Sequence, residues 1–328
     1  MGLPNDVVFS GRRAVHPRAA ARLGELHGRA SPPAPFSWDA RVGFLSKLSG
    51  MLGRGPVRQT IGEWRVLGVI ADGPMSVVYK AVSHRQDNRV AAVKVLKDSA
   101  VRVAARLSTE LGKQWEGERA LGLVHPNVVR TLACDCRGGT YYMVMEFIDG
   151  HSLASLIYEY PATLPGRRLS IIRQVAQGLA FLHGKGLIHR DICPKNVLVD
   201  GPGNAKLIDF GVAVSLEDRL RNTGRRTGRP SYMAPELIRD NVFDFRTDIY
   251  ALGVTMYEVC TGAKPLAGAD RYEKMRQHLH IVPTPPADVN PSVPLALSNA
   301  ISRCLAKDPD NRFQTVDELL AALPDAPF

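Results

Sequence analysis

Residues 189–196 read HRDICPKN, residues 209–211 read DFG, and residues 234–236 read APE. Asp191 and Asn196 stand five positions apart, and Asp209 follows them closely. A carboxylate in the first position can orient a hydroxyl group and receive its proton. The amide and the later carboxylate can hold a divalent metal between nucleotide phosphates. The order and spacing of the three strings therefore indicate phosphoryl transfer.

These strings, with the lysine-bearing stretch AAVKVLK at residues 91–97, resemble those of protein kinases, in particular the bacterial serine/threonine type. The resemblance runs from about Ile61 to the C-terminus. It implies an α+β fold of two lobes, a small antiparallel β-sheet lobe with one helix and a larger, mostly helical lobe. We expect three regions: a basic, largely flexible N-terminal extension (1–60), the kinase N-lobe (61–147) and the kinase C-lobe (148–328).

The composition fits a globular protein with a sizeable core, because 45% of the 328 residues are hydrophobic. No stretch reaches the roughly 18 to 20 apolar residues that a membrane helix needs. The first six residues, MGLPND, contain neither an apolar signal core nor a myristoylation pattern, so we expect a cytoplasmic protein. The five cysteines have no scaffold spacing and are predicted to be free thiols.

The net charge of +10 is unevenly distributed along the chain. Residues 1–60 hold nine basic and three acidic residues, a net +6, and the remainder carries +4. Within this extension, residues 42–52 could form a short amphipathic helix. It could dock on the kinase lobe, or contact a partner or an anionic membrane surface. No aromatic platform or recognition-helix pattern favours nucleic acid.

The small lobe is predicted to begin with a strand, a turn and a second strand. Residues 63–69 and 77–81 are strand-like, and Asp72-Gly73 between them is a turn signal. The resemblance makes this turn the glycine-rich loop that covers the ATP phosphates. Only Gly73 of its three glycines is present, since Ala71 and Ser76 stand at the other two positions. This departure predicts a stiffer loop and weaker ATP binding.

By the same resemblance, Lys94 would contact the α- and β-phosphates. A helix is expected at about Val101–Val124. The glutamate that pairs with this lysine in the family stands nine residues before a His-Pro-Asn turn, which points to Glu116. Glu118 competes, but it lies about 200° around the helix at roughly 100° per residue. We expect Glu116 to pair with Lys94.

The adenine site is also implied by the resemblance. Met145 would be the gatekeeper residue beside adenine, at the end of a strand that runs into a linker. The carbonyl group of Glu146 and the amide group of Ile148 would bond the edge of the base. The residues expected to enclose the ring are Val78, Ala92 and Leu198.

The large lobe should present the catalytic loop after a helix at about Leu169–Lys185, whose apolar residues recur at helical spacing. The resemblance gives Asp191 the role of general base. It makes Asn196 and Asp209 the ligands of Mg²⁺, with Mn²⁺ as an alternative, next to ATP. His189 would be structural.

Two positions depart from the usual kinase pattern. Cys193 stands where serine/threonine kinases carry a lysine, and Lys195 occupies the offset at which tyrosine kinases carry an arginine. Lys195 is therefore either the catalytic cation or a solvated lysine, and tyrosine specificity is not excluded. Residues 228–232 read GRPSY, with Arg229 in place of the usual threonine. Arg229 could form an ion pair with Asp191 and hold an inactive state, or face an acidic substrate.

The segment before residue 231 is rich in arginine, and Arg190 implies control by a phosphate on this loop. The candidate sites are Thr223 and Thr227; the alternative is a mobile basic loop without phosphate. The resemblance further implies that Asp248 anchors the catalytic loop. It also implies a buried ion pair between Arg312 and Glu236.

Taken together, the sequence predicts an ATP-dependent protein kinase. It would transfer the γ-phosphate to serine or threonine hydroxyls of protein substrates, including itself. The alternative from another class is a pseudokinase or regulatory scaffold, which would bind nucleotide or partners with little turnover. The loss of glycines around Gly73, together with Cys193 and Arg229, favours this alternative, whereas the intact set of catalytic residues opposes it.

Overall fold

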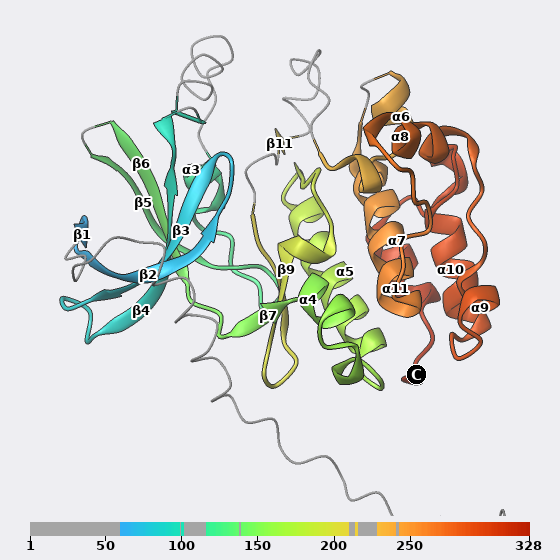
Figure 1. Ribbon diagram of the computed structural model, residues 1–328, viewed down its shortest axis with the longest axis horizontal. Coiled ribbons are helices and arrows are strands. Elements are labelled where there is room, and N and C mark those ends of the chain that lie inside the picture. Colours follow the sequence, from blue (N-terminus) through green and yellow to red (C-terminus); the bar gives the residue numbers. More distant parts are fainter. Residues whose placement is uncertain are drawn as a thin grey trace, which may run out of the picture. The chain divides into compact units, whose positions relative to one another are not determined.

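The computed structural model describes residues 60–98, 100–101, 116–137, 139–209, 214–215, 228–240 and 243–328. The first part of this region is an antiparallel sheet with strand order β1-β2-β3-β4-β6-β5, accompanied by the short helix α3 (Glu116–Ala120) (Figure 1). We call the sheet and α3 the N-lobe. Its strands are β1 (Thr60–Ile61), β2 (Trp64–Asp72), β3 (Ser76–Ser83), β4 (Arg89–Leu96), β5 (Thr131–Arg137) and β6 (Thr140–Glu146).

The two faces of β4 have different surroundings. Ala91 and Val93 are fully buried and pack with Trp64 in a small core on one face of the sheet. Successive side chains of a strand point to opposite faces, so Ala92 and Lys94 face the other way. The strand thereby presents a small side chain and a cation side by side. The predicted turn between β2 and β3 is closed by a hydrogen bond from the Gly73 amide to the Ser76 carbonyl, at 2.9 Å.

The end of the helix before the His-Pro-Asn turn differs from the prediction. A helix was expected up to Val124, but α3 ends at Ala120. Gly122 adopts a left-handed backbone with φ of 83°, a conformation that glycine adopts readily and that stops a helix. The predicted end at Val124 is therefore wrong. Residues 102–115 of the predicted helix lie outside the described residues.

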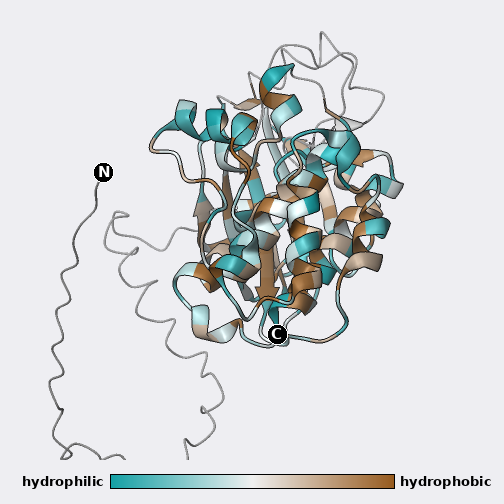
Figure 2. Cartoon of the chain, turned by 90° about the vertical axis from the view of Figure 1, so that its right-hand side faces the viewer, coloured by the Kyte–Doolittle hydropathy of each residue, from teal (hydrophilic) through white to brown (hydrophobic). Residues whose placement is uncertain are grey.

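The remainder, from β7 onward, forms the helical C-lobe (Figure 1). Several of its helices carry both hydrophilic and hydrophobic residues, as helices that cover a core do (Figure 2). Among the residues that the structure describes, no helix combines the length and the apolar character required to cross a bilayer. The helices are α4 (Leu153–Tyr158), α5 (Arg168–Gly184), α6 (Pro235–Arg239), α7 (Phe245–Thr261), α8 (Arg271–His280), α9 (Pro286–Val289), α10 (Leu295–Cys304) and α11 (Val316–Ala322).

Short strands connect these helices to the region of the catalytic motifs. The strands β7 (Gly150–Ser152), β9 (Val197–Asp200) and β10 (Ala205–Leu207) form one sheet, and β8 (Leu187–Ile188) pairs with β11 (Val214–Ser215). The helix predicted at Leu169–Lys185 is confirmed as α5. The chain runs from α5 through a turn into β8, and the motif HRDICPKN lies between β8 and β9.

The helix α7 is the central element of the C-lobe, and almost all its residues are buried. It begins with a capping box, in which the Asp244 carboxylate accepts from the Arg246 amide at 2.8 Å and Thr247 bonds back to Asp244. It ends at Gly262, which has the left-handed backbone typical of a helix C-terminus. These two signals fix the length of a helix that packs against α5, α9 and α10.

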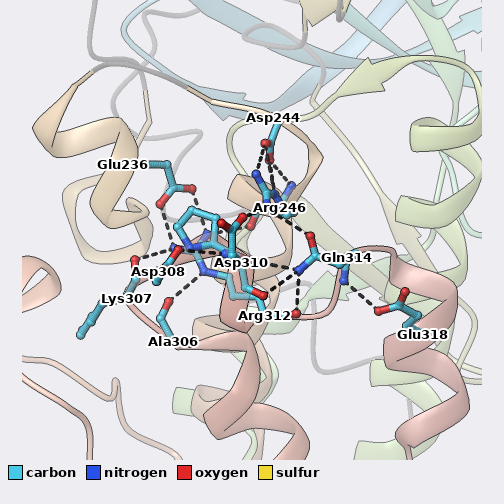
Figure 3. A network of polar contacts seen from close by, with 11 residues as sticks. Glu236, Asp244, Arg246, Ala306, Lys307, Asp308, Asp310, Arg312, Gln314 and Glu318 are labelled. Atoms are coloured by element: carbon cyan, nitrogen blue, oxygen red, sulfur yellow. Dashed lines mark hydrogen bonds and ion pairs between the residues drawn. The ribbon is translucent and has the colours of Figure 1, made fainter.

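The predicted ion pair between Arg312 and Glu236 is confirmed. Arg312 is fully buried, and its guanidinium donates to both Glu236 carboxylate oxygens at 2.8 and 2.9 Å (Figure 3). It also donates to the carbonyl groups of Ala306 and Arg246, so most of its N–H groups are satisfied. Thr247 adds a hydrogen bond to Glu236 at 3.0 Å. The network ties α6, which begins within the APE motif, to the start of α7 and to the loop after α10.

This network supports a prediction on stability. Arg312→Met should lower the free energy of unfolding by about 3–5 kcal/mol, because it leaves the Glu236 carboxylate buried without its cation. The matched control is Arg276→Met, which breaks the exposed pair between Arg276 and Glu273 on α8 and should cost at most about 1 kcal/mol. Urea titration measures both values. Equal losses in the two variants would contradict the structural importance of the buried pair.

Candidate active site

The catalytic loop is anchored on α7 by one buried carboxylate. Asp248 accepts hydrogen bonds from the backbone amides of His189 and Arg190 at 2.7 and 2.8 Å, and it contacts His183 at 3.0 Å. Burial alone would raise the pKa of Asp248, but the hydrogen bond from His183 and its neighbours bring that pKa below its ordinary value. Asp248 is therefore a carboxylate, and its predicted anchoring of the loop is confirmed.

The anchor holds an unusual backbone conformation in place. Arg190 has φ of 64°, in the left-handed region that costs a residue with a side chain free energy. Its guanidinium is buried and lies over the Phe243 ring, 4.6 Å from the ring centroid. Burial lowers the pKa of Arg190 to about 10, although the nearby Asp248 opposes this shift. The bend at Arg190 turns the chain, so that the next residue, Asp191, points away from the Asp248 carboxylate that anchors the loop.

Asp191 is held on two sides. One of its carboxylate oxygens, Oδ2, accepts a hydrogen bond from the Asn196 amide nitrogen at 2.8 Å, and that nitrogen also donates to the Asp191 carbonyl. The other oxygen, Oδ1, lies 3.4 Å from Nε of Arg229. The ion pair that the sequence offered as one alternative for Arg229 is thus present. Burial raises the pKa of Asp191, while Arg229 and Asn196 act in the opposite direction.

A second contact brings the two lobes together. Nζ of Lys94 in β4 lies 2.8 Å from Oδ1 of Asp209, a residue 115 positions later that follows β10. Lys94 is nearly buried, whereas the Asp209 side chain is 43% exposed. The Ile208 amide donates to the Asn196 carbonyl at 2.9 Å, which joins the catalytic loop to the segment that carries Asp209.

The side chains predicted around adenine come from both lobes. Val78 in β3 pairs with Lys94 across the strands, and Ala92 in β4 pairs with Met145 in β6. Val78, Ala92 and Ile148 are half-buried and pack against the main hydrophobic core. Leu198 lies in β9, also half-buried. Glu146 uses its carboxylate for Lys206, at 2.8 Å, and for the Arg130 amide.

Some predictions fall partly or wholly outside the described residues. Glu116 is the first residue of α3, but its side chain is not among those described, so its pairing with Lys94 stays a prediction. The same holds for Phe210 and Gly211 of the DFG motif. The candidate phosphorylation sites, Thr223 and Thr227, also lie outside.

The two positions that depart from the kinase pattern differ in exposure. Cys193 is fully buried, and burial raises the pKa of its thiol to about 12, so it is neutral at physiological pH. Lys195 is exposed, and it makes no ion pair or hydrogen bond with another residue that the structure describes. The five cysteines are free thiols, as predicted.

The sequence did not single out Glu258, which lies in the middle of α7. Its buried carboxylate accepts hydrogen bonds from the hydroxyl groups of Tyr158 and Tyr232, the latter at 2.6 Å. Tyr232 belongs to a short 3-10 helix, η5 (Pro230–Tyr232), next to Arg229. An acidic residue inside an otherwise apolar helix pattern was the available signal, because such a residue needs a partner when buried.

The donor set around Asn196 and Asp209 fits a hard divalent cation. Both hydrogen bonds between the Asn196 side chain and Asp191 use the amide nitrogen, so neither of them occupies the amide oxygen. The described residues contain no group of three or more His, Cys, Asp or Glu side chains arranged for a metal. A pair of oxygen donors suits Mg²⁺, which keeps several water and phosphate ligands, better than a transition metal.

Comparisons with known proteins agree with this geometry. Residues 64–322 match the family described as "Protein kinase domain". The chain is 34% identical over 264 residues to a probable serine/threonine-protein kinase, CPE1738, of Clostridium perfringens, which covers 80% of this chain and 38% of the relative. It is 32% identical to the serine/threonine-protein kinase PrkC of Bacillus subtilis, with 81% and 40% covered. For the serine/threonine-protein kinase PknD of Mycobacterium tuberculosis the identity is 35%, with 82% and 40% covered.

The chain spans about two fifths of the length of these curated relatives. The similarity therefore concerns the region that contains the motifs described above.

The anchor of the catalytic loop supports a prediction. Asp248→Asn places an NH₂ group where a carboxylate oxygen accepts a backbone N–H, so one buried donor loses its acceptor. We expect a loss of about 1–3 kcal/mol in the free energy of unfolding. Asp317→Asn, at an exposed position of α11, is the matched control and should change it by less than about 0.5 kcal/mol. The anchor would be refuted if calorimetry found both variants as stable as the wild type.

Proposed function

The chain belongs to the protein kinase family, and we propose that it transfers the γ-phosphate of ATP to serine or threonine hydroxyls of proteins, including its own. The contact between Lys94 and Asp209 carries this proposal. It joins a cation of the N-lobe sheet to a carboxylate next to the catalytic loop, which is where ATP would bind between the two lobes.

The proposed chemistry centres on Asp191. The substrate hydroxyl oxygen forms a bond to the γ-phosphorus, the bond from that phosphorus to the bridging oxygen of the β-phosphate breaks, and ADP leaves. Asp191 orients the hydroxyl and accepts its proton. The hydrogen bond from Asn196 fixes the Asp191 carboxylate for this task. Burial, which raises the pKa of Asp191, makes it a better proton acceptor than an exposed aspartate.

The remaining site residues are proposed to bind ATP and its metal. Lys94 would hold the α- and β-phosphates, with Glu116 as its partner, and Gly73 would cover the phosphates. The adenine ring would lie between Val78, Ala92 and Leu198, with the backbone of Glu146 and Ile148 at its edge. Asn196 and Asp209 would hold Mg²⁺ or Mn²⁺. The cation, when bound, neutralises negative charge on the phosphates.

We also propose the wider organisation expected from the sequence. Residues 1–60 would form a basic extension that contacts a partner or an anionic surface, before an N-lobe to residue 147 and a C-lobe from residue 148. The substrates would be proteins, and Thr223 and Thr227 would be sites of autophosphorylation. The supply of ATP and Mg²⁺ favours a cytoplasmic location.

A pseudokinase is the second candidate function. The observation that favours it is the ion pair of Arg229 with Asp191, combined with the buried neutral Cys193. An arginine over the base could keep the substrate hydroxyl away. Such a protein would bind nucleotide and act through its conformation.

The deciding experiment is the transfer of labelled γ-phosphate from ATP, with Mg²⁺ and then Mn²⁺, to the protein itself and to a generic basic protein. The wild type should incorporate label. Asp191→Ala and Asp209→Asn should reduce incorporation by at least about a hundredfold, because one removes the base and the other a metal ligand. Phosphoamino-acid analysis distinguishes serine and threonine from tyrosine. A wild type that binds ATP in a thermal-shift assay but transfers no label would establish the pseudokinase.

We propose that Lys195, an exposed residue of the catalytic loop, supplies a positive charge to the transferring phosphate. Lys195→Ala should lower kcat by about tenfold or more, since a positive charge that meets the transferring phosphate stabilises the transition state. Lys185→Ala serves as the control. Lys185 is also exposed, but it lies at the end of α5, before β8 and outside the catalytic loop. Unchanged steady-state kinetics of the Lys195 variant would leave it as a solvated surface lysine.

A further inference from the structure

Two carboxylates lie near each other in the candidate site. Asp209 is close enough to Asp191 to contribute to the raised pKa of that group, although burial is the larger cause. Each has one cation against it: Lys94 lies 2.8 Å from Asp209, and Arg229 lies 3.4 Å from Asp191. Removing either cation would leave two like charges in a partly buried place.

The catalytic loop itself does not supply the second cation. Cys193 is buried and neutral, and the side chain of Lys195 forms no ion pair or hydrogen bond with another residue that the structure describes. The guanidinium of Arg190 stacks on the Phe243 ring, 4.6 Å from its centroid. Among the described residues, the cation in contact with Asp191 therefore comes from the segment before the APE motif.

The backbone around Arg229 places it there. Gly228 has φ of 113°, and a Cβ atom at this residue would lie only 3.2 Å from the Arg190 carbonyl oxygen. The glycine thus allows this segment to approach the catalytic loop closely. Arg229 then caps η5, with its carbonyl accepting from the Tyr232 amide at 2.9 Å. Tyr232 is in turn held by the buried Glu258 of α7.

The contact places a positive charge against Asp191 without forming a short hydrogen bond. At 3.4 Å, the distance from Nε of Arg229 to Oδ1 is longer than the usual 2.9 Å or so of an N–H···O hydrogen bond. Oδ1 accepts no hydrogen bond from the described residues, whereas Oδ2 is occupied by Asn196. The charge of Arg229 thus faces a buried oxygen of Asp191 that has no hydrogen-bond donor of its own among the described residues.

We propose that Arg229 is a positioning residue for phosphoryl transfer, which supplies to Asp191, from the segment before the APE motif, a positive charge that Cys193 does not provide; the role proposed for Lys195 at the transferring phosphate is separate. The inference rests on the proposed kinase function. Arg229 holds the Asp191 carboxylate in position, and it places a cation beside the reacting groups. The ion pair then belongs to the working enzyme and is not an inhibitory contact.

The test separates charge from shape. Arg229→Met keeps an unbranched, flexible stem and removes the charge, whereas Arg229→Lys keeps the charge. We expect the Met variant to lose at least about tenfold in kcat, with little change in the KM for ATP, and the Lys variant to retain most of the activity. Arg239→Met, at an exposed residue at the end of α6, is the control for loss of one arginine and should match the wild type.

A rescue experiment completes the design. Adding Cys193→Lys to Arg229→Met returns a cation to the catalytic loop, and the double variant should recover part of the lost kcat. Thermal unfolding of every variant checks that it is folded, and the comparison of the Met and Lys variants stands if the buried Cys193 site rejects a lysine.

The outcomes separate the two proposals. A wild type that transfers no label overturns the kinase function and the inference with it. A wild type whose activity matches that of Arg229→Met overturns the inference alone. A Met variant more active than the wild type also overturns it and makes the ion pair an inhibitory brake.

Discussion

Asp248 holds the catalytic loop by accepting two successive backbone N–H groups with a fully buried carboxylate. The rest of the site depends on this contact, because it fixes the left-handed bend at Arg190 that directs Asp191 toward Asn196. A buried charge is tolerated only when hydrogen bonds replace water, and His183 with the two amides provides them. The carboxylate is in turn placed by α7, whose capped start and nearly complete burial leave it little freedom.

Much of this arrangement could be predicted from the sequence, since it is encoded in short motifs. The spacing of Asp191 and Asn196 lets the amide reach back to the carboxylate within a single turn of 3-10 helix, η3 (Pro194–Asn196). The strand β4 followed from its alternation, and α5 from its apolar stripe. The partners of Asp248 and Arg312 lie far away in the sequence, and only the resemblance to protein kinases allowed them to be anticipated.

Other contacts had no local signal. The stacking of Arg190 on Phe243 and the bonds of Tyr158 and Tyr232 to Glu258 join segments that are 26 to 100 residues apart. The end of α3 was placed too late, because the His-Pro-Asn turn was a more conspicuous stop signal than Gly122, where the backbone turns left-handed. For Arg229 the sequence left two partners open, and the choice of Asp191 required knowing that Gly228 brings the two segments together.

The helix α7 is linked to both partners of the ion pair between Asp191 and Arg229. Through Asp248 it sets the position of the catalytic loop, and through Glu258 it holds Tyr232 and thus the short helix that Arg229 caps. The helix α7 therefore positions both Asp191 and Arg229, although these two residues come from segments that are about forty positions apart. The positive charge of Arg229 is carried by the segment before the APE motif and not by the catalytic loop. Any change in that segment also changes the electrostatic environment of Asp191, so substrate binding and the readiness of the base become coupled.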